Sequence, residues 1–325
     1  MCAPELSLVL PMYNARQYVS DCLASIYVQT EAERIEVILV DDGSPDDSAS
    51  VAESWLKANT NLNNWHIIRQ VNRGLGGARN TGLQAANSPY VWFIDTDDEI
   101  ATDSLEVILS RLGRNKDVFA FSYRTNPFSI IKKVTEPILD IEAAELTGKV
   151  NFWCAPFNVY KAAFLKERHL FFREKFLHED NEFTVRLIGE RPRMDYFPEE
   201  VYIYNFRNQG SINNTVSLKA LRDSMEHLIS CEELISRKKG LPDYVVRAMH
   251  QTCGVVLATV FRRSLLLSDS DWQLFKKELQ HKKRLIKQTQ TDQPFTMRCF
   301  NLLLATIKKR QFYKAAFGIK RILHK

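Results

Sequence analysis

The sequence lacks the patterns that mark several classes of protein. Its six cysteines form no C-x-x-C pair, so neither a zinc-ligand spacing nor a disulfide framework is indicated. No apolar run approaches the roughly 20 residues that cross a bilayer, and no internal repeat is present. The apolar run at residues 6–10 has no basic segment before it and is cut short at Pro11, which favours a first strand over a signal peptide. These absences predict a cytoplasmic globular protein with reduced thiols.

Acidic residues are nearly absent from the last part of the chain. Residues 279–325 hold twelve Lys and Arg against one acid, Asp292, a charge of +11, so the remainder carries −6 of the net +5. A basic tail on an acidic body predicts an anionic partner, such as a membrane surface, nucleic acid or an acidic protein. Residues 297–325 also carry two apolar stripes, which is typical of an interfacial helix. We expect this tail to lie on the cytoplasmic membrane face; the alternative is a terminal helix docked on the body.

Strand-like and helix-like segments alternate through the first hundred residues. Short apolar runs occupy residues 6–10, 35–40, 65–71 and 90–94, with helical periodicity or capping signals between them. This order predicts an α/β fold with a mostly parallel sheet and helices on both faces, followed from residue 218 by a helical region. Because ligands bind beyond the carboxyl ends of such strands, we expect one rim to gather residues 11–14, 41–44, 72–80 and 95–98.

Four acids follow the fourth predicted strand within five positions: Asp95, Asp97, Asp98 and Glu99. Mg²⁺ and Mn²⁺ prefer carboxylate oxygens as ligands. The alternative is that these acids cap the helix beginning near Thr102, but capping needs only one or two of them. Crowding four like charges raises their pKa values unless a cation compensates. The stretch therefore predicts a site for a divalent cation.

Two further segments of the predicted rim carry polar or glycine-rich motifs. Asp41 and Asp42 follow the second strand and could accept hydrogen bonds from a base or ribose, or be solvated turn acids. RGLGGARN, at residues 73–80, predicts a loop whose backbone N–H groups and Arg79 contact an anion. GLGGAR also resembles the G-x-G-x-x-G motif of nicotinamide dehydrogenases. Arg79 in its sixth position, and its place after the third strand, argue against that alternative.

Taken in order, the segments LSLVLPMYNARQYVSDCLASI, VILVDDGSPDDS, NRGLGGARNTGL and YVWFIDTDDEI resemble the family 2 glycosyltransferases with the GT-A fold. The resemblance is specific over about the first hundred residues and lapses after about Asn214. It implies a catalytic domain at 1–214, in which 1–124 bind a nucleotide sugar and 125–214 face the acceptor. Residues 215–325 would form the helical C-terminal region.

The resemblance implies a role for individual residues on the donor side. Pro11 and Tyr13 would line a uridine site, and Asp42 would hydrogen-bond the base. Asp97, with Asp95 or Asp98, would hold the Mn²⁺ or Mg²⁺ that bridges the diphosphate. The full donor-binding set implied is Pro11, Tyr13, Asn14, Asp42, Gly74, Arg79, Asp95, Thr96 and Arg207.

A second acidic motif lies in FLHEDNEFTVRLIG, which looks like the E-D motif of the family. In that position Asp180 would be the catalytic base and Glu179 would support it. The alternative is an acidic first helical turn favoured by the helix dipole. Further on, YIYNFRNQGSI resembles a family segment in which Asn205 replaces a first arginine and Arg207 matches a second.

The activity implied is metal-dependent, inverting transfer of a hexosyl or N-acetylhexosaminyl group. The donor would be a nucleotide sugar, most plausibly a UDP-sugar, and the acceptor a glycan or lipid-linked hydroxyl in cell-surface polysaccharide, lipopolysaccharide or other glycan synthesis. Nucleic acid is not among the partners implied. The alternative is a non-catalytic nucleotide-sugar-binding protein of the same fold, which would lack the D-x-D or the base. The location expected is cytoplasmic, with the tail as a peripheral attachment to the inner face of the cell membrane.

Overall fold

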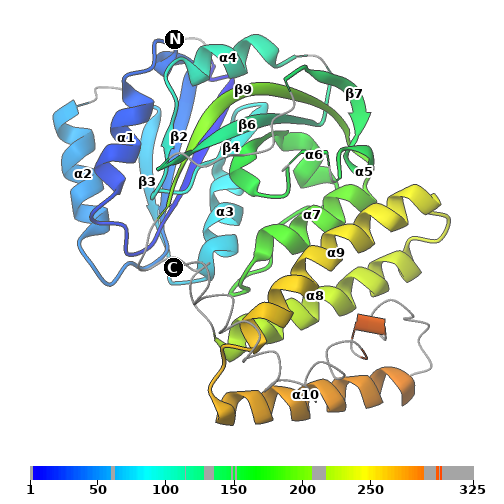
Figure 1. The fold of residues 1–325 in the computed structure, drawn as a ribbon. Coiled ribbons are helices and arrows are strands. Elements are labelled where there is room, and N and C mark those ends of the chain that lie inside the picture. Colours follow the sequence, from blue (N-terminus) through cyan, green and yellow to red (C-terminus); the bar gives the residue numbers. More distant parts are fainter. Residues whose placement is uncertain are drawn as a thin grey trace. The chain divides into compact units, whose positions relative to one another are not determined.

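The computed structural model describes residues 3–59, 63–113, 115–127, 135–147, 149–150, 152–206, 217–288, 298–299 and 301. The chain divides into two compact units, Met1–Arg207 and Asn208–Lys325 (Figure 1). The domain boundary predicted at 214/215 falls among residues 207–216, outside the described residues, and stays a prediction. No described helix is both long and apolar enough to cross a membrane.

The first unit is built on a nine-stranded sheet with the order β3-β2-β1-β4-β8-β6-β9-β5, in which β7 pairs with β9. The first four strands are parallel, as predicted, and every residue of β1 and β2 is buried. Burial of both faces explains their continuous apolar sequences. The strands are β1 (Leu6–Met12), β2 (Ile35–Asp41), β3 (Trp65–Arg69) and β4 (Tyr90–Phe93).

Beyond β4 the sheet becomes mixed. Strand β8 lies antiparallel between β4 and β6, while β9 runs parallel to β6 and antiparallel to β5 and β7. The predicted α/β fold is confirmed, but the parallel pattern does not continue through the second half of the sheet. These strands are β5 (Glu99–Ile100), β6 (Val118–Asn126), β7 (Ile138–Glu142), β8 (Asn158–Lys161) and β9 (Arg193–Asn205).

Helices cover both faces of the sheet, as predicted. On one face α1 (Val19–Tyr27), α2 (Ser48–Asn59) and α4 (Ser104–Arg111) pack into the main core with alternate residues of β1 and β2. On the other face, Ala78 of α3 (Gly74–Ala85) packs on Ile38 and Val40. The shorter or later helices of this unit are η1 (Ala32–Arg34), α5 (Ala143–Leu146), η2 (Ala155–Phe157), α6 (Ala162–Glu167) and α7 (Glu179–Gly189).

The glycine-rich segment RGLGGARN forms the start of α3, so the prediction of a loop there was wrong. Close packing is the physical reason. A Cβ atom added to Gly76 would lie 2.3 Å from the carbonyl oxygen of Arg173, and one added to Gly82 would lie 2.2 Å from Cγ1 of Val9. The glycines let this helix approach β1 and the segment before α7, and these contacts offset the low helix propensity of glycine.

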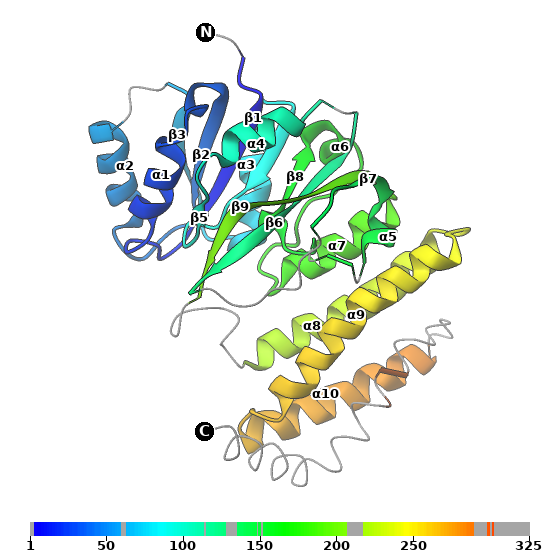
Figure 2. The same ribbon diagram turned by 45° about the horizontal axis from the view of Figure 1, so that its top comes forward.

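The second unit is helical, which confirms the predicted C-terminal helical region. It contains α8 (Leu218–Arg237), α9 (Asp243–Ser264) and α10 (Asp269–Gln288), coloured from yellow-green to orange in Figure 2. Buried apolar residues such as Leu228, Val245 and Phe275 line these helices, and α8 packs on both α9 and α10. Apart from residues 298, 299 and 301, the basic tail at 297–325 lies outside the described residues. Its apolar stripes and membrane contact stay predictions.

Candidate functional site

Hydrogen bonds join the segments that were expected to share one rim of the sheet. The backbone N–H of Asp42, after β2, donates to the carbonyl oxygen of Met12 in β1 at 2.9 Å. The Thr96 hydroxyl, after β4, donates to the carbonyl oxygen of Pro11 at 3.0 Å, and the N–H of Asn14 donates to Oγ of Ser44 at 3.3 Å. The carboxyl ends of β1, β2 and β4 therefore meet at one edge, where Tyr13 is 53% exposed.

Asp42 is a buried, oriented carboxylate and not a solvated turn acid. Its Oδ1 accepts hydrogen bonds from Nε2 of Gln70 at 2.6 Å and from the backbone N–H of Arg73 at 2.7 Å. The hydroxyl of Thr81 in turn donates to Oε1 of Gln70 at 2.5 Å, which fixes the amide. Asp41 differs, because its Oδ1 accepts from the N–H of Ser44 at 3.1 Å and closes the turn.

The acids after β4 form a compact cluster. One carboxylate oxygen from each of Asp95, Asp97 and Asp98 lies within 4.8 Å of the others, with Asp95 and Asp97 half-buried and Asp98 buried. The following helix, α4, begins only at Ser104, so these side chains are outside its first turn. A converging set of hard oxygen donors fits a cation such as Mg²⁺ or Mn²⁺.

Strand β9 supports this cluster from the side. The hydroxyl of Tyr202 donates to Oδ2 of Asp98 at 2.7 Å, and the N–H of Asn205 donates to Oδ1 at 2.8 Å. Burial, with the neighbouring Asp95 charge, raises the pKa of Asp98 to about 7. A bound cation would oppose that rise. Sequence reasoning missed both supports, because the segment YIYNFRNQGSI, which begins at Tyr202, points only to Arg207 as a contact, and Asn205 stands where the family has an arginine.

Arg79 is buried between two carboxylates that come from different parts of the chain. Its Nη2 donates to Oδ1 of Asp95 at 2.7 Å and its Nη1 to Oε1 of Glu179 at 2.5 Å. The guanidinium carbon lies 5.2 Å from the ring centroid of Phe172, and only 2% of the side chain is exposed. Burial lowers the pKa of Arg79, but Asp95 and Glu179 raise it more, so the cation is stable there. Its predicted contact with a donor stays a prediction.

The predicted base lies at the start of α7. Asp180 is half-buried, its Oδ1 accepts from the N–H of Asn181 at 2.8 Å, and it forms no ion pair within the described part of the chain. Burial raises the pKa of Asp180, and it raises that of Glu179 to about 7 against the pull of Arg79. Glu182 is paired with Arg186 at 2.8 Å. The three acids of this turn thus have different surroundings.

Another predicted donor-binding residue, Gly74, lies where two backbone segments approach closely. Gly74 has φ of +77° at the first position of α3, where an added Cβ would lie 2.9 Å from the backbone nitrogen of Lys175. Gly74 therefore allows the start of α3 to lie close to the backbone of Lys175. Arg207 lies outside the described residues.

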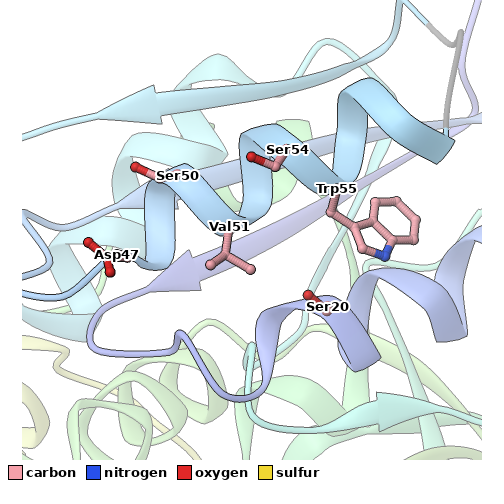
Figure 3. A pocket seen from close by; sticks show the side chains of 6 residues that line it. All are labelled: Ser20, Asp47, Ser50, Val51, Ser54 and Trp55. Atoms are coloured by element: carbon pink, nitrogen blue, oxygen red, sulfur yellow. The ribbon is translucent and has the colours of Figure 1, made fainter.

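A separate hollow of about 500 Å³ lies between α1 and α2 (Figure 3). It is lined by Ser20 of α1, by Asp47 just before α2, and by Ser50, Val51, Ser54 and Trp55 of α2, and the Val51 side chain points from α2 toward α1. The Trp55 ring stacks on Trp65 with centroids 6.2 Å apart. None of the site residues predicted from the sequence lines this hollow.

Residues 7–168 match the family described as Glycosyl transferase family 2. The Bacillus subtilis protein described as the uncharacterized glycosyltransferase EpsJ is 28% identical over 213 residues, which cover 62% of this chain and 61% of that protein. This chain therefore spans less than two thirds of that relative's length.

Two solved structures share the fold at low sequence identity. The Staphylococcus aureus TarS fragment 1–349 in complex with UDP-GlcNAc has a TM-score of 0.62 at 17% identity, covering 94% of this chain and 92% of that one. The Pyrobaculum calidifontis mannosyltransferase PcManGT, in complex with GDP-Man and Mn²⁺, has a TM-score of 0.57 at 17% identity over 94% and 87% of the two chains. At this identity the likeness establishes the fold.

Proposed function

The chain belongs to glycosyl transferase family 2, and from this premise we propose that it moves a sugar from a UDP-sugar to an acceptor hydroxyl, with inversion at the anomeric carbon. One observation carries the proposal. The acidic cluster after β4 and the acids at the start of α7 are joined through the single buried side chain of Arg79. A site for a metal-bound diphosphate and a candidate base therefore belong to one arrangement.

On the donor side, Asp42 would accept a hydrogen bond from the base, while Pro11, Tyr13 and Asn14 would line the uridine site. The UDP-GlcNAc held by the S. aureus fragment supports a uridine donor, with a hexosyl or N-acetylhexosaminyl group as the sugar. Asp97, with Asp95 and Asp98, would hold Mn²⁺ or Mg²⁺, and the Mn²⁺ held by the P. calidifontis mannosyltransferase supports this. When bound, the cation neutralises charge that develops on the departing diphosphate.

On the acceptor side, Asp180 would take the proton of the attacking hydroxyl. The acceptor oxygen then forms its bond to the anomeric carbon as the bond from that carbon to the diphosphate oxygen breaks, which inverts the configuration. Half-burial raises the pKa of Asp180, so the carboxylate is a stronger base than one in water. Glu179, held by Arg79, would fix the first turn of α7 around it.

A non-catalytic nucleotide-sugar-binding protein of the same fold is the second candidate. Such a protein would be expected to lose the D-x-D or the base, and this chain keeps both Asp97 and Asp180. We therefore favour an enzyme of cell-surface polysaccharide, lipopolysaccharide or other glycan synthesis, acting on a glycan or lipid-linked acceptor.

The test is a screen of nucleotide sugars for UDP release, with and without Mn²⁺, beside calorimetric titration with UDP and with NAD. We expect UDP to bind only with the divalent cation, NAD not to bind, and one UDP-sugar to be turned over. Transfer at the full rate after EDTA treatment would contradict the role of the metal. Binding of UDP without turnover of any donor or acceptor would favour the non-catalytic protein.

We further propose that residues 297–325 attach the protein to an anionic membrane surface. Each basic residue near such a surface contributes on the order of 1 kcal/mol, and the segment holds Lys308, Lys309 and Arg310 in succession. The test is sedimentation with anionic liposomes, comparing the full chain with a variant ending at residue 296. Equal sedimentation of the two would exclude this role.

A further inference from the structure

We propose that Arg79 is a positioning residue that couples the metal-binding carboxylates to the base-bearing helix, an inference that rests on the proposed function. In the proposed reaction Arg79 contacts neither the acceptor oxygen nor the anomeric carbon. Its two terminal nitrogens bind Asp95, in the acidic cluster, and Glu179, which precedes the predicted base. The planar guanidinium of Arg79 therefore links the acidic cluster to the helix that carries the predicted base.

The environment of Arg79 requires a guanidinium. Asp95 and Glu179 lie 16 and 100 residues away in sequence, and each accepts from a different nitrogen of the same planar fork. A lysine ammonium is a single point charge and cannot reproduce two bonds with this fixed separation. The Phe172 ring packs against the guanidinium, and the near-complete burial keeps water from replacing a lost bond.

The bonds of Arg79 restrict how the two carboxylates can turn. Asp95 has Oδ1 held by the arginine, which orients the carboxylate whose other oxygen can face a cation. Glu179 is the first residue of α7, so its bond fixes the turn that carries Asp180. Partners that orient a metal ligand typically change metal affinity or activity by 10- to 100-fold when removed. Arg79 should therefore affect cation affinity and turnover together.

The decisive variant is Arg79→Lys, with Arg111→Lys as its matched control. Arg111 also pairs with one carboxylate, Glu199 at 2.6 Å, and lies 5.1 Å from the ring centroid of Phe197, but it is on α4 outside the site. Mn²⁺ affinity in the presence of UDP is measured by calorimetry, and turnover is measured separately. We expect Arg79→Lys to weaken Mn²⁺ affinity by about tenfold or more and to lower turnover by 10- to 100-fold, while Arg111→Lys matches the wild type.

Wild-type Mn²⁺ affinity and turnover in Arg79→Lys would overturn the coupling while leaving the proposed function intact. Absence of UDP binding by the wild type itself would instead overturn the proposed function. A loss of melting temperature in Arg79→Lys with unchanged Mn²⁺ affinity would show a merely structural role and also overturn the proposal.

If Arg79→Lys does not fold, the variant Glu179→Gln tests the proposal instead, because it changes only the contact between Arg79 and α7. The neutral amide is a weaker acceptor than the carboxylate, so Arg79 loses part of its hold on α7 and keeps Asp95 less firmly oriented toward the cation. We expect Mn²⁺ affinity to fall on the order of tenfold, although Glu179 is outside the acidic cluster. Unchanged Mn²⁺ affinity in Glu179→Gln would overturn the proposal.

Discussion

The two units differ in where their buried ionisable side chains lie. In the first unit, buried ionisable side chains such as Asp42, Arg79, Asp98 and Glu179 collect where strands end or α7 begins. Among the described residues of the second unit, the buried ionisable groups include Glu232, which contacts His250 at 3.1 Å. Ion pairs such as Arg222 with Glu278 lie on the surface of its helices.

This difference indicates that buried charge serves the site in the first unit, whereas apolar packing holds the second unit together. Removing charge from water costs free energy that neighbouring hydrogen bonds and opposite charges must offset. The first unit buries several charged side chains at one edge of its sheet and gives them such partners. The second unit is held mainly by apolar contacts between long helices. Substitutions at the acids of the site should therefore affect activity, whereas substitution of a buried acid in the second unit should affect stability. Two acid substitutions test this contrast, and one glycine substitution in each unit compares the packing.

The largest effect is expected from Asp97→Asn. A bound metal supplies several kcal/mol of transition-state stabilisation, and each 1.36 kcal/mol is tenfold in rate, so sugar transfer should fall by about ten-thousandfold or more and be effectively abolished. Activity is measured across an Mn²⁺ titration, with circular dichroism to confirm the fold. The control is Glu232→Gln, a buried acid of the second unit, which should lower the melting temperature and keep the activity of the folded protein. Retention of most activity by Asp97→Asn would contradict the metal assignment.

The next effect is expected from Asp180→Asn. Removing a general base that acts only in the transition state should lower turnover by about a hundredfold to ten-thousandfold and leave UDP affinity nearly unchanged. Glu179→Gln is assayed beside it and should retain more turnover. A mild Asp180→Asn with an inactive Glu179→Gln would reverse the two roles. If neither change lowers turnover, the acids only begin the helix.

A smaller effect, on stability, is expected from Gly76→Ala. The added methyl would overlap the Arg173 carbonyl oxygen at 2.3 Å, so α3 or the facing segment must shift. Overpacking of this kind typically costs about 1–3 kcal/mol of unfolding free energy. Chemical denaturation of the first unit measures it. An unchanged midpoint would show that the close approach of α3 is not needed for stability.

The smallest effect, of opposite sign, is expected from Gly254→Ala in α9. Apart from its chain neighbours and the backbone of its own helix, no heavy atom of the described residues lies within 4 Å of the Cβ that this change would add. Replacing glycine by alanine there should stabilise the second unit by about 0.5–1 kcal/mol. The same denaturation experiment reports it. A loss of stability would mean that this glycine, like Gly76, makes a close contact.

The sequence predicted the parallel half of the sheet and its rim because apolar runs and polar strand ends are local signals. It failed where distant contacts decide the structure. Helix α3 exists despite its glycines because of its packing on Val9 and Arg173, and β8 is a four-residue strand inserted between β4 and β6. The acids of the site were visible as motifs. The bond from Tyr202 to Asp98 could not be predicted, although Tyr202 begins the quoted segment YIYNFRNQGSI, because it depends on the pairing of β9 with β5, which no local pattern encodes.

Strand β9 also determines when the site can form during folding. Asp98 receives its two hydrogen bonds from residues 104 and 107 positions later in the chain, and the same strand pairs with β5, β6 and β7. Contacts of such sequence separation close large loops and are generally slow to form. During synthesis the acidic cluster is therefore incomplete until the last strand of the first unit has been made, and a truncated chain ending before β9 would leave Asp98 without these partners.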